Sequence, residues 1–261
     1  MVLDLISQPI QLSKDQIRKL ADRHFGIGFD QLLVVEPPYQ PDLDFHYRIF
    51  NADGGEVEQC GNGARCFAKF VREAGLTAKN RIKVSTKSGN IELVVEPNGL
   101  VTVDMGQPNF LPESLPFTAE EPAIHYPLEV DDKNLEVGAI SMGNPHCVLL
   151  VDNIENAPVE TLGPAICHHQ RFPNQVNVGF LQVVDRRYAR LRVFERGSGE
   201  TLACGTGACA AMVAGRRWGM LDRKAKIRLP GGHLFIRWDG EGHPVKMTGP
   251  AVTVFEGQIE I

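Results

Sequence analysis

Two cysteines have closely similar surroundings in the two halves of the chain. Cys60 starts the sequence Cys-Gly-Asn-Gly, and Cys204 starts the sequence Cys-Gly-Thr-Gly. Each segment opens an apolar run with helical spacing, so each cysteine is predicted to lie at a helix N-terminus. The unpaired N–H groups and the dipole of such a terminus favour an anion, which lowers the pKa of a thiol. A single cysteine is more often a small buried hydrophobe, but two in matched turns favour chemistry.

The chemistry that two matched thiols suggest is proton transfer with inversion at carbon. One sulfur removes a proton from one face of the carbon, and the other delivers a proton to the opposite face. Acyl transfer would instead require one cysteine, one histidine partner and one oxyanion hole. Two helix N-termini directed at a substrate carboxylate would stabilise the charge that develops next to it. Because no pyridoxal or dinucleotide motif is evident, a cofactor-free mechanism is predicted.

Further polar residues stand at the ends of matched segments. His146 follows Gly143-Asn144-Pro145, a loop that glycine and proline fix, and could accept or relay a thiol proton. Glu195-Arg196 stands where the first half has Asn51-Ala52, which predicts a substrate contact there; the competing interpretation is a solvated ion pair. A guanidinium such as that of Arg196 can bind a carboxylate bidentately. The other seven histidines lack metal-ligand spacing, so no metal site is predicted.

The similarity of the halves continues upstream of the cysteines. Subtracting 144 from the residue number pairs Arg192 with Arg48, Phe194 with Phe50, and Glu200 with Glu56. An internal duplication is therefore predicted. The predicted fold class is α+β: two pseudo-symmetric domains, each a strongly curved mixed sheet or barrel wrapped around a central helix, with the active site in the cleft between them. The predicted boundaries are 1–105, completed by 250–261, and 106–249.

Hydrophobic periodicity, caps and turn residues predict the elements of each half. The predicted helices are 14–24, the run after Cys60 up to Gly75, 159–169, and the run after Cys204. The predicted strands are 29–36, 45–50, 82–86, 91–96, 100–105, 147–151, 176–184 and 189–194. Residues 106–127 lack periodicity and are read as a junction. Gln31, after Gly28-Phe29, is matched to Gln182, after Gly179-Phe180. The counterpart of Gly143–His146 falls just before Met1, so the first half is predicted to lack its opening strand.

The composition is that of a soluble protein with a small-molecule partner. Of the 261 residues, 43% are hydrophobic and 23% charged, and the net charge is −5 without any block of like charge. Nucleic acid and membrane partners are therefore not expected. The start lacks a signal-peptide pattern, which predicts a cytoplasmic protein. The six cysteines are predicted to be free thiols, with four of structural type: Cys66, Cys147, Cys167 and Cys209.

These motifs together resemble the diaminopimelate epimerase family. The resemblance runs from about residue 20 to the C-terminus and is carried by Phe50–Gly54, Cys60–Cys66, Met142–His146, Glu195–Gly197, Glu200–Gly207, Gly26–Leu32 and Met247–Pro250. It implies a cofactor-independent isomerase that interconverts LL- and meso-2,6-diaminopimelate, a step in lysine and peptidoglycan precursor biosynthesis. It also implies two similar domains that close on substrate, and a homodimer.

The resemblance also assigns roles to residues. Cys60 and Cys204 are implied to be the acid and base, exchanging roles with direction, with His146 and Glu195 tuning the thiols. Turn groups for the reacting carboxylate are implied at Gly61, Asn62, Gly205 and Thr206. The remaining implied substrate contacts are Gln31, Asn51, Asn144, Asn177, Glu195 and Arg196.

One family motif is not found. Members begin with a strand carrying His-Gly-x-Gly-Asn-Asp-Phe, and Met1–Asp4 matches the residues just after it. A late start is inferred, and we expect this form to bind substrate poorly or to be inactive.

Other functions are kept as alternatives. A proline racemase or hydroxyproline epimerase would also use two cysteines, although Arg196 and Asn177 favour a longer, doubly charged substrate. A non-catalytic amino-acid-binding module is disfavoured by both thiols being retained beside His146 and Glu195. A thiol redox protein is disfavoured by the lack of Cys-x-x-Cys.

Overall fold

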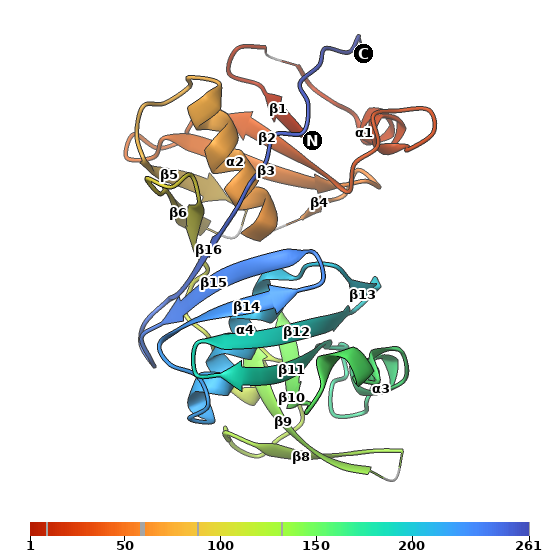
Figure 1. Cartoon of the computed structure of the whole chain (residues 1–261). Coiled ribbons are helices and arrows are strands. Elements are labelled where there is room, and N and C mark those ends of the chain that lie inside the picture. The colour runs from red at the N-terminus through yellow and green to blue at the C-terminus, as the bar shows by residue number, and fades with distance from the viewer. Residues whose placement is uncertain (9, 58–60, 88, 132, 261) are drawn as a thin grey trace. The chain divides into compact units, whose positions relative to one another are not determined.

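The chain divides into two compact units. The computed structural model describes residues 1–261 except 9, 58–60, 88, 132 and 261. Unit 1 comprises residues 1–104 and 249–261, and unit 2 comprises residues 105–248 (Figure 1). Within the described residues, no helix has the length and apolar character needed to cross a membrane.

The described residues of unit 1 form a mixed sheet with two helices. The sheet order is β1-β2-β3-β5-β6-β7, with the short β4 paired to β3. The pairs β1–β2 and β3–β5 are parallel, and the others are antiparallel. The strands are β1 (Val2–Asp4), β2 (Gln31–Glu36), β3 (Phe45–Asn51), β4 (Glu56–Val57), β5 (Arg81–Thr86), β6 (Gly89–Val95) and β7 (Val101–Asp104). The helices are α1 (Lys14–Ala21), which begins with a capping box at Ser13, and α2 (Gly61–Glu73).

Unit 2 repeats this plan and adds a hairpin. Its sheet order is β16-β15-β14-β12-β11-β10-β9-β8, with the short β13 paired to β12. The strands are β8 (Tyr126–Val130), β9 (Lys133–Ser141), β10 (Pro145–Leu150), β11 (Asn177–Asp185), β12 (Tyr188–Glu195), β13 (Gly199–Thr201), β14 (Lys224–Leu229), β15 (Gly232–Trp238) and β16 (Val245–Gly249). The helices are α3 (Val159–Cys167), α4 (Gly205–Arg217) and two single 3-10 turns, Pro112–Ser114 and Ile154–Asn156.

The strand registers confirm the internal duplication and the α+β class. Phe50 pairs with Glu56 across β3 and β4, as Phe194 pairs with Glu200 across β12 and β13. The parallel pair β3–β5 has its counterpart in β12–β14, and α2 and α4 have identical lengths. Two sequences that place their hydrophobic and turn residues at the same intervals have thus reached the same topology.

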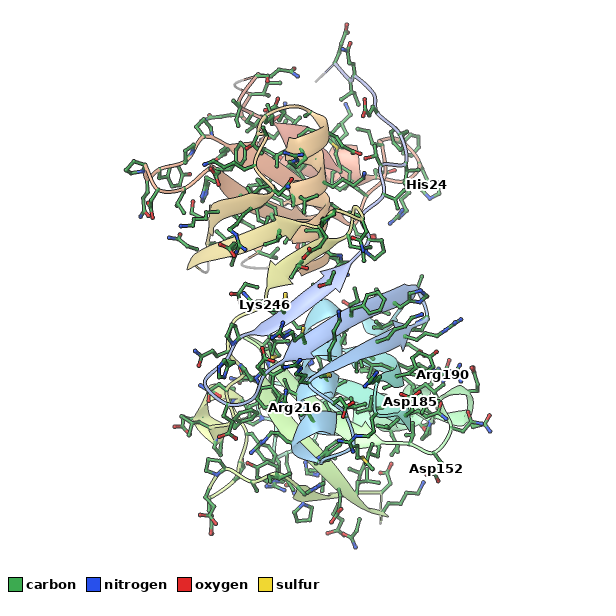
Figure 2. The ribbon with its side chains drawn as sticks, turned by 60° about the vertical axis from the view of Figure 1, so that its left-hand side comes forward. His24, Asp152, Asp185, Arg190, Arg216 and Lys246 are labelled. Atoms are coloured by element: carbon green, nitrogen blue, oxygen red, sulfur yellow. The ribbon has the colours of Figure 1, made fainter. Side chains whose placement is uncertain are left out.

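The central helix α4 is surrounded by its sheet. It contacts strands β9, β10, β11, β12, β14 and β15, and its small side chains are buried on every side: Ala208, Ala210, Ala211, Val213 and Ala214. A helix that is apolar all round belongs inside a core. At its C-terminal end, Arg216 (Figure 2) donates to the carbonyl of Asp239 at 3.2 Å and lies over the Trp238 ring. This contact ties the far end of α4 to the end of β15.

Helix α2 is less enclosed than α4. Phe67 packs against the rings of Phe45 and Tyr47, while Cys66 on another face is exposed. The assignment of Cys66 to the structural cysteines is therefore wrong, because its side chain packs in no core. Cys147, Cys167 and Cys209 are buried, as that assignment requires.

Two expectations about strands are corrected by the structure. Unit 1 does have an opening strand, since Val2–Asp4 pairs parallel with Leu33–Val35 as β10 pairs with β11. The stretch 106–127, predicted to be a junction without periodicity, ends in the first residues of β8, which begins at Tyr126 and pairs with β9 in a hairpin. Pro127 obscured this strand, but β8 lies at the edge of the sheet, where a proline leaves no ladder bond unmade.

The register also corrects the match between Gln31 and Gln182. Leu32 pairs with Phe50, and Val178 pairs with Phe194, so Gln31 occupies the position of Asn177 instead. The Gln182 side chain bridges the chain at Asp152 and Ile154. Local composition suggested the wrong match because the register depends on the partner strand.

Candidate functional site

Cys204 lies at the N-cap of α4. Its Sγ accepts a hydrogen bond from the N–H of Gly207 at 3.4 Å, and its carbonyl accepts from the N–H of Ala208 at 3.0 Å. A Cβ on Gly207 would lie only 3.1 Å from this Sγ and 3.1 Å from a methyl group of Val193. Glycine is therefore needed for the helix turn to approach the sulfur this closely.

The environment of Cys204 does not lower the pKa of its thiol. Burial, and then the negative charge of Glu195, raise that pKa to about 12, against the smaller opposing effects of the Gly207 N–H and the Thr206 hydroxyl. The prediction that the helix N-terminus would lower this pKa is wrong, because desolvation outweighs it. Cys204 is a free thiol in its protonated form at neutral pH.

Glu195 stands at the end of β12, half-buried. Its Oε1 accepts a 2.5 Å hydrogen bond from the hydroxyl of Thr201 on β13. No ion pair joins Glu195 to Arg196 among the described residues, so the competing interpretation as an ion pair is not supported. Sequence reasoning missed Thr201. The signal that could have found it is the internal repeat, which has Val57 at that position.

His146 is connected to Cys204 through two side chains. Asn144 Oδ1 lies 3.0 Å from His146 Nε2, and Asn144 Nδ2 donates to Thr206 Oγ1 at 3.3 Å. The Thr206 hydroxyl in turn lies 3.7 Å from the Cys204 sulfur. Burial, and then the charge of Arg196, lower the pKa of His146 to about 3. The imidazole is therefore neutral at physiological pH.

Asn177 holds the strand ends of unit 2 together. Its Nδ2 donates to the carbonyl of Pro145 at 3.1 Å, and its Oδ1 accepts from the N–H of Arg196 at 3.0 Å. The side chain is almost completely buried. Arg196 itself is exposed, and its guanidinium donates to the carbonyl of Asn174 at 3.4 Å. Most of its N–H groups remain available to an anion.

Unit 1 presents a matching set of neutral side chains. Gln31 Nε2 donates to Asn51 Oδ1 at 3.2 Å, at the paired ends of β2 and β3. Gly61 is the first residue of α2, and Asn62 follows it. Among the described residues, the buried Asn62 Oδ1 has no hydrogen-bond partner. Cys60 lies outside the described residues.

The structure thus brings most of the predicted residues of unit 2 together. Asn144, His146, Thr206 and Cys204 form one connected group, and the charge of Glu195 acts on the Cys204 thiol. Gly205 lies in the first turn of α4, and Asn177 lies beside Arg196. Negative and neutral groups therefore meet at a buried thiol. No group of three or more His, Cys, Asp and Glu side chains that could hold a metal ion occurs in the part of the chain that the structure describes.

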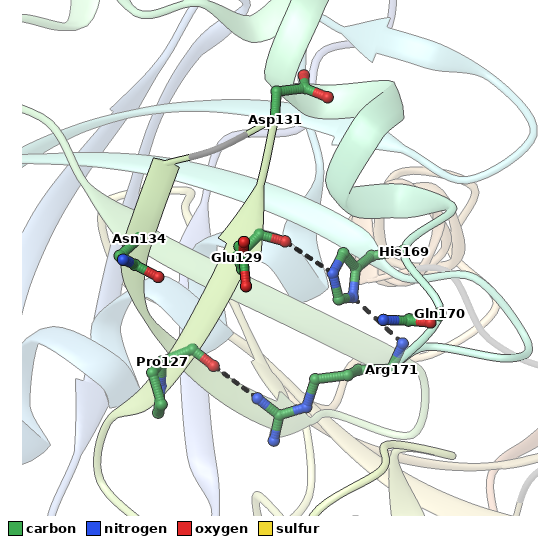
Figure 3. A pocket seen from close by; sticks show the side chains of 7 residues that line it. All are labelled: Pro127, Glu129, Asp131, Asn134, His169, Gln170 and Arg171. Carbon is green, nitrogen blue, oxygen red and sulfur yellow. Dashed lines mark hydrogen bonds between the residues drawn. The ribbon is translucent and has the colours of Figure 1, made fainter.

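A surface hollow lies elsewhere in unit 2, between the β8–β9 hairpin and the segment after α3 (Figure 3). His169 Nε2 lies 3.0 Å from the Glu129 carbonyl, and Arg171 donates to the Pro127 carbonyl at 2.6 Å. These polar groups satisfy one another and fasten β8 to the neighbouring loop. The hollow contains none of the predicted site residues.

Comparison with known proteins adds independent information. The model of a family described as diaminopimelate epimerase matches residues 2–111 and 138–254. The chain is 62% identical to a diaminopimelate epimerase from Stutzerimonas stutzeri and 60% identical to one from Azotobacter vinelandii. Both alignments cover 100% of this chain and 95% of the relative.

Solved structures show the same fold at low sequence identity. A phenazine biosynthesis protein of the PhzF family from Bacillus anthracis is 20% identical, with a TM-score of 0.70 over 100% of this chain and 92% of its own. A probable proline racemase from Agrobacterium radiobacter is 15% identical, with a TM-score of 0.65 over 94% and 80%.

Proposed function

Because the chain belongs to the diaminopimelate epimerase family, we propose that it interconverts LL- and meso-2,6-diaminopimelate, as an isomerase that needs no cofactor. The step belongs to the formation of lysine and peptidoglycan precursors. The reaction inverts one α-carbon and changes nothing else. It therefore requires one proton to leave and another to arrive on the opposite face.

We assign these two proton transfers to Cys60 and Cys204. The observation that carries this assignment is the position of Cys204 at the N-cap of α4, in a chain whose sequence repeats Cys-Gly-x-Gly 144 residues earlier. Cys204 is protonated in this environment, which suits it to deliver a proton. Cys60 then acts as the thiolate that removes the proton, and the roles exchange in the reverse direction.

His146 and Glu195 adjust the ionisation of the thiols in this proposal. Glu195 opposes ionisation of Cys204 through its negative charge. His146 is neutral, and because the amide oxygen of Asn144 can only accept, the Nε2 of His146 donates to it and orients the Asn144 Nδ2 towards the Thr206 hydroxyl beside the thiol. Each transfer changes the charge on a sulfur, so groups that compensate for this change lower the barrier.

The reacting carboxylate is assigned to the N-termini of the two central helices. Gly61 and Asn62 begin α2, and Gly205 and Thr206 begin α4, so each pair offers N–H groups that the helix does not use. These groups stabilise the negative charge that spreads onto the carboxylate when the α-proton leaves. Asn62 Oδ1, which has no hydrogen-bond partner in the described part of the chain, can accept a hydrogen bond from a substrate ammonium group.

Recognition of the second amino-acid end is assigned to the remaining polar groups. Arg196 offers an exposed guanidinium to a carboxylate, and Glu195 offers a carboxylate to an ammonium group. Gln31 and Asn51 in unit 1, with Asn144 and Asn177 in unit 2, add neutral donors and acceptors. Such a site selects a long zwitterion over a simple amino acid.

Replacing each thiol by alanine tests the proposal. The assay follows conversion of LL-diaminopimelate into the meso isomer, and we expect Cys60→Ala and Cys204→Ala to lower kcat by at least about a thousandfold relative to the unsubstituted protein. Cys66→Ala, at an exposed cysteine on α2, is the control and should keep normal activity. If either active-site variant turned over at the rate of the control, the two-thiol assignment would be wrong.

A homodimer and a cytoplasmic location complete the proposal. The family resemblance suggests both. Light scattering of the purified chain would give twice the monomer mass if the dimer forms.

A further inference from the structure

The two units differ at two positions of the repeated hairpin: unit 2 has a carboxylate and a hydroxyl there, and unit 1 has neither. Unit 2 has Glu195 and Thr201, while the positions 144 earlier in unit 1 hold Asn51 and Val57. Several residues around them are repeated, since Arg192, Phe194 and Glu200 match Arg48, Phe50 and Glu56. The hydroxyl thus occurs in the unit that carries the carboxylate and is replaced by a methyl group in the other.

The β12–β13 hairpin brings the side chains of Thr201 and Glu195 into contact. Thr201 pairs with Val193, so Glu195 is its diagonal neighbour on the same face of the hairpin. The Thr201 hydroxyl donates to Glu195 Oε1 at 2.5 Å. A charge-assisted bond of this length holds a carboxylate in one orientation.

The opposite face of the same hairpin is fixed independently. Glu200 accepts two hydrogen bonds from the Arg192 guanidinium, at 2.6 and 2.8 Å. Because neighbouring residues of a strand point to opposite faces, this pair sets the position of β13 without involving the Thr201 hydroxyl. Unit 1 holds its own hairpin in the same way, through Arg48 and Glu56. The hydroxyl of Thr201 is therefore not needed to close the hairpin.

We propose that Thr201 is a positioning residue that holds the carboxylate of Glu195 at a fixed place beside Cys204, and so sets the ionisation of that thiol during the reaction. The inference rests on the proposed function, since it treats Cys204 as a proton donor and acceptor. The hydroxyl occupies Oε1, and a carboxylate has lone pairs left to accept a further hydrogen bond. Without it the carboxylate rotates among several orientations, and its charge acts on the sulfur from a larger distance.

If Thr201 only supported the strand, Thr201→Val would leave the activity unchanged, whereas a role for the hydroxyl predicts a loss. Threonine is β-branched and suits a strand, but valine suits a strand equally well. Val57 occupies this position in the repeated hairpin of unit 1. Thr201→Val therefore keeps the shape and the strand propensity and removes only the hydroxyl. Thr201→Ser keeps the hydroxyl and removes a methyl group.

Steady-state kinetics of these two variants is the first test. We expect Thr201→Val to lower kcat about ten- to hundredfold, as the loss of a hydrogen bond to a charged group does, with KM changed less than about threefold. Thr201→Ser should recover most of the rate. In a Glu195→Gln background the valine variant should add less than about a threefold loss, because the two residues act as one unit. The proposal would be overturned if Thr201→Val kept the wild-type kcat, or if the same substitution lowered kcat as much in the Glu195→Gln background as it does in the wild type.

Titration of the Cys204 thiol is the second test and does not depend on turnover. Thiolate absorbance is followed against pH in the full chain, as the difference between proteins that contain Cys204 and those with Cys204→Ala. We expect Thr201→Val to move the midpoint to lower pH and Thr201→Ser to leave it near its original value. An unmoved midpoint in Thr201→Val would overturn the inference even if the epimerase activity is present. Conversely, a shifted midpoint would support it even if the substrate were a different amino acid.

Discussion

At the scale of single residues, burial determines the charge of the groups around the thiol. Cys204 and His146 are both nearly inaccessible to water, and each is held in its neutral form. The helix N-terminus acts on Cys204 only as a smaller opposing effect. The thiol therefore gains its charge only when a proton is transferred, which is the behaviour expected of a proton donor.

The neutral state of His146 makes stability depend on pH. The folded chain binds a proton at His146 only near pH 3, whereas the unfolded chain does so near 6.5. Between these values the unfolded state holds more protons, so the free energy of unfolding falls as the pH falls. The slope from one such group approaches about 1.4 kcal/mol per pH unit.

Denaturant unfolding at several pH values measures this dependence. We expect His146→Gln to show a shallower decline than wild type between pH 6.5 and pH 3. His233→Gln, at an exposed histidine, serves as the control and should keep the wild-type slope. Equal slopes for wild type and His146→Gln would contradict the neutral assignment.

Asn62 and Asn177 provide a second contrast between residues. The buried Asn62 Oδ1 lacks a partner among the described residues, whereas Asn177 makes two hydrogen bonds to the backbone. We expect Asn62→Leu to leave the free energy of unfolding unchanged or slightly higher while raising KM about tenfold. We expect Asn177→Leu to cost about 2 kcal/mol of stability. Loss of stability in Asn62→Leu with an unchanged KM would show that its amide is structural.

At the scale of elements, the first turn of α4 determines where the sulfur lies. A methyl group at position 207 would crowd both Cys204 Sγ and Val193. Alanine also favours the helix by up to about 1 kcal/mol, so Gly207→Ala should change the melting temperature little. We expect kcat to fall about tenfold or more because the thiol is displaced. Unchanged kcat, with the helix intact by circular dichroism, would show that the sulfur position tolerates this shift.

The arginine–glutamate pairs fix the hairpins that lead to both cysteines. The side chains of Arg192 and Glu200 are 23% and 27% exposed, and they meet in a two-bond contact. We expect Glu200→Gln to lower the free energy of unfolding by about 1 kcal/mol, since partial exposure weakens the pair. Asp15→Asn removes the more exposed pair with Arg18 and should cost less. A smaller loss for Glu200→Gln than for Asp15→Asn would contradict this.

At the scale of the whole molecule, the duplication, the α-helices and the longer strands up to β7 and from β10 to β12 follow from the sequence, whereas β14, β15 and β16 were not predicted. The same spacing of apolar, turn and capping residues occurs twice, and each copy folds by the same local rules. The strand register could not be predicted because it depends on the partner strand. The β8–β9 hairpin was not predicted because Pro127 is tolerated only at the edge of the sheet. The raised pKa of Cys204 could not be predicted from its position at the helix N-cap, because the local sequence does not show that the thiol is buried. The contact of Thr201 with Glu195 required the hairpin pairing.

The central claim is that two different groups exchange protons with opposite faces of one carbon. The most direct measurement is to incubate LL-diaminopimelate with the chain in heavy water and follow deuterium at the α-carbon of substrate and product. Two thiols predict that the meso product carries solvent deuterium from the first turnover, while the remaining LL substrate carries little. Equal early labelling of substrate and product would indicate a single base, and formation of meso product without deuterium would exclude exchange with solvent-equilibrated thiols.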